Sequence, residues 1–225
     1  MAALFCDGVM SKKSPDLHGN APDKSTVALL LIDVINDLEF EGGEVLVQYA
    51  LPAAKKIAAL KQRAKLVGIP AIYVNDNFGK WRSDFKKLVA HVIDDETRGR
   101  PIAELVRPQA EDYFVLKPKH SGFFSTSLDL LLKHLGAETL ILVGWASDIC
   151  ILFTASDAHM REYDLVIPAD CVASEDPEEN ERVLELMQRV QEANISPSTD
   201  LDLKALTSER GHPVRQRAKP AHTSK

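Results

Sequence analysis

Five apolar runs of strand length recur along this chain, and segments of helical length separate them. The first, TVALLLID at residues 26–33, is almost uninterrupted, a pattern typical of a strand buried on both faces of a parallel sheet. Four similar runs follow at residues 70–75, 113–117, 139–143 and 164–168, and a weak sixth candidate lies at residues 194–198. Such spacing predicts one extended, mostly parallel sheet.

Helical patterns fill the gaps between these runs. They lie at residues 51–67, 85–93, 128–135, 148–161 and 177–193. Strands that alternate with helices form β-α-β units, whose right-handed crossovers place helices on both faces of the sheet. The sequence therefore predicts a three-layer α/β domain at residues 25–203. Before it we expect a flexible leader at residues 1–24, and after it a basic, disordered tail at residues 204–225.

Composition excludes several classes of protein. The net charge is -6, while the short tail carries six lysines or arginines against one glutamate, so the remainder is acidic and unsuited to broad nucleic-acid binding. No apolar run approaches the roughly 20 residues that span a bilayer, and the N-terminal apolar stretch is too short for a signal peptide. Three cysteines, Cys6, Cys150 and Cys171, match neither a disulfide scaffold nor a zinc site. We predict a cytoplasmic protein.

Ligands of parallel sheets bind beyond the carboxyl ends of the strands. That rule selects Asp33, the segment 75–81, Lys117 and the segment 144–150. A carboxylate at a strand end can carry protons near neutral pH, because burial raises its pKa and a nearby ammonium lowers it, although a lone aspartate there could equally cap a helix or turn. Of the two neighbouring lysines, we assign Lys117 to the site and Lys119 to the surface.

Cys150 follows the fourth strand, where a glycine-containing turn leads into a helix. A thiol in the first helical turn lies near unpaired N–H groups and the positive end of the helix dipole. We therefore expect a lowered pKa and a nucleophilic sulfur. The same N–H groups could bind an oxyanion. For Cys150 alone, the alternative is a small buried hydrophobe.

Taken together, three segments resemble the isochorismatase-like cysteine hydrolase family over residues 26–194. They are LLLIDVINDLEFEGG, VLKPKHSGFFSTSLDLLLKHLG and LILVGWASDICILFTASDAHMREYDLVIPADC. The resemblance implies a catalytic triad of Asp33, Lys117 and Cys150 on a six-stranded sheet of order 3-2-1-4-5-6. It also implies a homo-oligomer, and a cis peptide bond between Trp145 and Ala146 that would turn the Ala146 N–H towards the oxyanion.

The segment after the second strand departs from a metal-binding pattern. Residues 75–81, NDNFGKW, lack the Asp-x-His and the further histidine of a nicotinamidase-like metal site. We therefore expect no metal and no cofactor. Within this family, a nucleophilic cysteine favours an acyl substrate over the enol ether of isochorismatases.

These observations predict hydrolysis of a small amide, ureide or carbamoyl compound through a thioester. Asp33 would accept the thiol proton beside the charged Lys117, Cys150 would attack the carbonyl carbon, and the N–H groups of Ala146 and Cys150 would hold the oxyanion. The alternatives are an ether or ester hydrolase and a non-catalytic binding or scaffold protein of the same fold. The expected substrate-binding residues flank the strand ends: Asn77, Lys80, Trp81, Phe124, Trp145 and Ser147.

Overall fold

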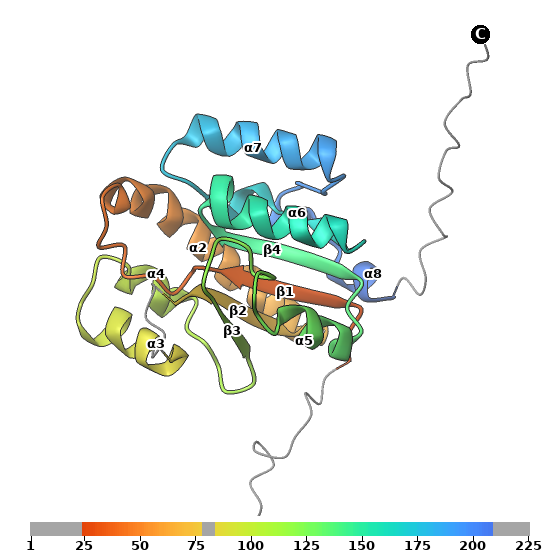
Figure 1. Cartoon of the computed structure of the whole chain (residues 1–225), viewed down its shortest axis with the longest axis horizontal. Coiled ribbons are helices and arrows are strands. Elements are labelled where there is room, and N and C mark those ends of the chain that lie inside the picture. The colour runs from red at the N-terminus through yellow and green to blue at the C-terminus, as the bar shows by residue number, and fades with distance from the viewer. Residues whose placement is uncertain (1–23, 78–83, 209–225) are drawn as a thin grey trace, which may run out of the picture.

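The computed structural model describes residues 24–77 and 84–208. A parallel sheet forms its centre, with β1 (Val27–Ile32), β2 (Ala71–Asp76), β3 (Tyr113–Lys117), β4 (Thr139–Trp145) and β5 (Asp164–Val166) in the order β3-β2-β1-β4-β5 (Figure 1). Every residue of β1 is fully buried, as its continuous apolar sequence predicts. The predicted three-layer α/β fold is confirmed.

Alternate side chains of β1 pack on opposite faces of the sheet. Val27, Leu29 and Leu31 belong to a core with α2 (Gly43–Leu66), α3 (Phe85–Asp94), α4 (Arg100–Leu105) and the start of α8 (Leu203–Ser208). Ala28, Leu30 and Ile32 belong to a second core with α5 (Leu128–Leu135), α6 (Leu152–Met160) and α7 (Pro177–Val190). The period-2 alternation of a strand thus supplies both helix layers from one short segment.

All of the predicted helices are present, but one is longer than predicted and another is divided in two. The helix predicted at 51–67 begins eight residues earlier, and the segment 148–161 divides into a π-helical turn, η1 (Ser147–Ile151), followed by α6. Two short helices, α4 and α8, were not predicted. The second of these extends past the predicted domain end at residue 203, while the remaining tail and the leader up to residue 23 lie outside the described residues.

The sixth strand lies elsewhere than predicted. Val172–Ala173 forms β6, which pairs with Gly144 and Trp145 at the end of β4, so β5 and β6 follow one another along the same edge of β4. The predicted strand at 194–198 is reduced to a single bridge between Asn194 and Val166. That bridge is parallel and lies beside β5, where the predicted order 3-2-1-4-5-6 places its sixth strand, whereas the additional pairing of β6 with β4 was not predicted. Within the described residues, no helix is long and apolar enough to cross a membrane.

Candidate active site

Three side chains meet at the carboxyl edge of the sheet. Asp33 directly follows β1, Lys117 ends β3, and Cys150 lies in the turn after β4. Lys117 Nζ lies 2.8 Å from Asp33 Oδ2 and 3.4 Å from Cys150 Sγ. The lysine side chain is 0% exposed and that of Asp33 8%, whereas Lys119 is exposed. The expected convergence is therefore present, and it involves Lys117 rather than its neighbour.

Backbone geometry fixes the position of Asp33. Its φ is 53°, in the left-handed region that aspartate tolerates better than most residues and that is enriched at functional sites. Opposite its neighbour Ile32, β4 carries Gly144, whose φ is 126°. A Cβ at this glycine would lie 1.9 Å from the Ile32 carbonyl oxygen, so only glycine permits β4 to approach β1 here.

A second set of contacts fixes the turn that carries the thiol. The Ala146 carbonyl accepts hydrogen bonds from the N–H groups of both Ile149 and Ile151, which gives the wide π-helical turn. Thr154 Oγ1 donates to the Cys150 carbonyl (2.7 Å) and accepts from the Gly122 N–H (3.0 Å). This hydroxyl connects the thiol turn to the loop that follows Lys117. Sequence reasoning missed it, because a threonine inside a helical pattern carries no distinguishing signal.

The expected cis bond is absent. The described residues contain no cis peptide bond, so Trp145 and Ala146 are joined in the ordinary trans form. Ala146 is extended, with φ -65° and ψ 127°, as is common for a residue just before a helical turn. The prediction of a cis bond was wrong. Because that bond was the reason for assigning the Ala146 N–H as an oxyanion donor, this assignment is no longer supported.

Burial and charge set the protonation states of the three groups. Burial raises the pKa of Asp33, against the opposing attraction of Lys117. For Lys117, burial lowers the pKa, but attraction to Asp33, Cys150 and Asp76 outweighs it and the pKa is raised. Burial and the Asp33 charge both raise the pKa of the Cys150 thiol. The expectation of a lowered thiol pKa is therefore wrong, because burial and the nearby carboxylate disfavour the thiolate more than Lys117 favours it.

A fourth charged residue joins this group. Asp76, the last residue of β2, places Oδ2 3.6 Å from Lys117 Nζ, and its backbone N–H donates to Asp33 Oδ1 at 2.7 Å. The sequence prediction selected the segment 75–81 without choosing this residue. The available signal was its place at the end of a strand, the same rule that found Asp33 and Lys117.

The expected substrate-binding residues occupy different environments. The N–H of buried Asn77 donates to the Lys117 carbonyl at 3.0 Å. Trp145 is buried in the core on the α2 side of the sheet, and Ser147 is buried with no hydrogen-bond partner for Oγ among residues 24–77 and 84–208. Phe124 is half exposed in the segment between β3 and α5. Lys80 and Trp81 lie outside the described residues.

Within the described residues, no three side chains of histidine, cysteine, aspartate or glutamate are grouped as a metal site requires.

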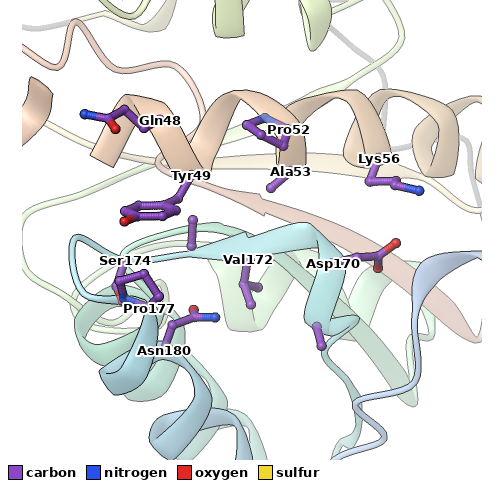
Figure 2. A pocket seen from close by; sticks show the side chains of 12 residues that line it. Gln48, Tyr49, Pro52, Ala53, Lys56, Asp170, Val172, Ser174, Pro177 and Asn180 are labelled. Carbon is purple, nitrogen blue, oxygen red and sulfur yellow. The ribbon is translucent and has the colours of Figure 1, made fainter. Parts of the chain in front are cut away.

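A groove of about 340 Å³ lies between α2 and the segment from β6 into α7. Figure 2 shows Tyr49 and Asn180 at one end of this groove and Lys56 and Asp170 at the other. No residue of the triad lines it, so the thiol site is distinct from this groove.

Comparison with known proteins agrees with the fold. Residues 27–198 match the family model described as the Isochorismatase domain. The uncharacterized isochorismatase family protein YaaI of Bacillus subtilis is 41% identical over 173 residues, which cover 77% of this chain and 94% of that protein. The ureidoacrylate amidohydrolase RutB of Serratia proteamaculans is 35% identical over 189 residues, covering 73% and 75% respectively. The crystal structure of N-carbamoylsarcosine amidase from Thermoplasma acidophilum superposes with a TM-score of 0.62 at 28% identity, covering 79% of this chain and 99% of that one. The chain therefore belongs to the isochorismatase family.

Proposed function

We propose that this chain hydrolyses the C–N bond of a small amide, ureide or carbamoyl compound, with Cys150 as the nucleophile. The observation that carries the proposal is the buried contact of Lys117 Nζ with both Cys150 Sγ (3.4 Å) and Asp33 Oδ2 (2.8 Å). A nucleophile, a base and a fixed positive charge are the groups that acyl transfer requires. The amidohydrolase and amidase names of two of the relatives above support the same reaction class.

The first half of the reaction forms a thioester. The Cys150 thiol proton moves to Asp33, whose raised pKa suits it to hold a proton near neutral pH. The sulfur then bonds to the substrate carbonyl carbon, and the carbonyl oxygen becomes an oxyanion, which we assign to backbone N–H groups of the thiol turn, including that of Cys150. When the tetrahedral intermediate collapses, the C–N bond breaks. Asp33 returns its proton to the leaving nitrogen, which departs as a neutral amine.

The second half releases the acid. Water attacks the thioester carbonyl carbon and gives one proton to Asp33. The carbon–sulfur bond then breaks, and Asp33 returns that proton to the Cys150 sulfur. One water is consumed, the products are a carboxylic or carbamic acid and an amine or ammonia, and the site returns to its resting form. Lys117 stays protonated throughout, and it compensates the negative charge of Asp33 or of the sulfur in the states in which either is ionised.

A substrate screen tests this proposal. Small amides, ureides and carbamoyl compounds are incubated with the full chain, and ammonia or amine release is measured. We expect release from at least one class, and its loss in Cys150→Ala. The matched control is Cys171→Ala, since Cys171 is also a free cysteine but is buried away from the triad beside Asp170. The control variant should retain the wild-type rate.

Intact-protein mass spectrometry tests the covalent step. Quenching the reaction with acid should trap the acyl group on Cys150 as a mass increase equal to the substrate minus its leaving amine. Turnover of an amide that persists in Cys150→Ala would contradict the thioester route. Ester or ether cleavage with no amide cleavage would instead assign the site to the second reaction class of this family.

A further inference from the structure

Asp76 faces Lys117 because of strand register. The two residues are direct partners across the parallel pair β2 and β3, so their side chains project from the same face of the sheet. Asp76 Oδ2 lies 3.6 Å from Lys117 Nζ, in addition to the shorter contact of 2.8 Å that Asp33 Oδ2 makes with the same nitrogen. Within the described residues, this ammonium therefore contacts two carboxylates and one thiol. The ion pair with Asp33 alone would compensate the charge of Lys117 in the resting site, so the presence of a second carboxylate calls for its own explanation.

The second carboxylate matters when the first is neutral. After Asp33 takes the thiol proton, the Lys117 ammonium faces the thiolate and Asp76. Once the sulfur has bonded to the substrate carbon, the sulfur is neutral as well. Asp76 is then the one anionic side chain left among the described contacts of the ammonium. A buried ammonium without an anionic partner is driven to lose its proton.

We propose that Asp76 is a positioning residue that keeps Lys117 protonated while Asp33 holds the transferred proton. This inference rests on the proton path of the proposed function and adds a residue to it. Asp76 suits the role because its side chain is 32% exposed, whereas that of Asp33 is 8% exposed, so its own charge costs less desolvation. It takes no proton in either half of the reaction. Its backbone N–H, which holds Asp33 Oδ1, is unaffected by changes to its side chain.

The test imitates the proton-bearing state with Asp33→Asn, which is neutral at every pH. The ionisation of Lys117 is followed by NMR of protein labelled with ¹³C at the lysine ε-carbon, and the Lys117 signal is identified by its absence in Lys117→Met. We expect the Lys117 pKa to be lower in Asp33→Asn than in the wild type. It should fall by about one further unit or more in Asp33→Asn/Asp76→Asn, because burial then acts without a carboxylate partner.

Two further variants separate charge from local structure. Asp33→Asn/Asp76→Glu retains the negative charge and should restore the Lys117 pKa of Asp33→Asn. Asp129 provides a matched control, since its side chain is 31% exposed and it too pairs with a lysine, Lys133, on α5. Asp33→Asn/Asp129→Asn should leave the Lys117 pKa unchanged.

Equal Lys117 pKa values in Asp33→Asn and Asp33→Asn/Asp76→Asn would overturn the proposal, as would a glutamate at position 76 that restores nothing. If the double asparagine variant does not fold, Asp33→Asn/Asp76→Ser makes the same comparison. None of these measurements requires a substrate. A failure of the substrate screen and a failure of this inference are therefore distinguishable.

Discussion

Two buried lysines in this fold each pair with an aspartate, but their other contacts differ. Lys61 on α2 lies against Asp112 (2.5 Å) and also donates to the hydroxyl of Tyr73 (2.9 Å). Lys117 lies against Asp33 (2.8 Å), but its further contacts are a thiol and a second carboxylate. The hydrogen-bond acceptors of Lys61 in the described part of the chain are all oxygen atoms, none of which belongs to the candidate site. The partners of Lys117 include the nucleophile and the base of the proposed reaction, so under that proposal its buried charge serves chemistry as well as packing.

The largest expected effects come from removing each lysine in turn. Lys117→Met and Lys61→Met should each lower the free energy of unfolding by about 3 to 5 kcal/mol, because each leaves a buried carboxylate without its cation. Only Lys117→Met should also lower kcat/KM, by about 1,000-fold or more, as expected for a member of a catalytic unit. Urea unfolding and steady-state kinetics measure the two quantities. An equal loss of kcat/KM in folded Lys61→Met would erase the distinction between the two lysines.

The pH dependence of turnover tests the state of Asp33. The proposed base must be ionised, so kcat/KM should fall about tenfold per pH unit below its pKa. Burial raises that pKa, and the acid limb should therefore lie above the ordinary carboxyl value of 3.8. A limb at or below this value would show that another group controls the rate.

The ionisation of Asp33 changes the stability of the fold with a sign opposite to that of a carboxylate whose pKa is lowered by a partner. A raised pKa means that ionised Asp33 costs stability above its folded pKa, and this cost disappears as the pH falls.

A smaller effect is expected at the Lys61 pair. Tyr73→Phe removes a hydroxyl that accepts from Lys61 and donates to the Val106 carbonyl at 2.6 Å. The loss leaves two buried polar groups short of a partner and should lower the free energy of unfolding by about 1 to 3 kcal/mol. The kcat/KM should remain within about twofold of wild type, because Tyr73 contacts no triad residue that the structure describes. A large kinetic effect with unchanged stability would place Tyr73 in the site.

The smallest effect is expected where the charges are exposed. His91 on α3 contacts Asp95 (2.7 Å) and Asp37 (3.2 Å), and these hydrogen bonds raise its pKa above 6.5. A raised histidine pKa adds stability that is fully present below the ordinary value and is lost as the pH rises through the folded value. His91→Gln should therefore lower the free energy of unfolding at about pH 5 by less than about 1 kcal/mol, and by nothing at about pH 9. The opposite pH dependence would contradict this interpretation.

The residues of the candidate site were partly accessible from sequence, for a physical reason. Asp33 and Lys117 each end a run of apolar residues, and a parallel sheet brings the carboxyl ends of its strands to one edge. Cys150 follows the same rule one turn later. Asp76 obeys it too but was not selected, because its importance depends on lying opposite Lys117 in the register of β2 and β3. Register is set by the contacts between strands, and apolar runs alone do not specify it.

By itself, then, the sequence determined the layers of the fold, since burial on both faces requires the uninterrupted apolar pattern of β1 and helices on either side. It also indicated that Asp33, Lys117 and Cys150 meet at the carboxyl edge, but it did not single out Asp76. Only the tertiary structure decided how those groups ionise, because the desolvation that raises the pKa values of Asp33 and Cys150 comes from atoms that lie far away in the chain. The pairing of β6 with β4 was decided in the same way, by packing between distant segments that no local pattern records.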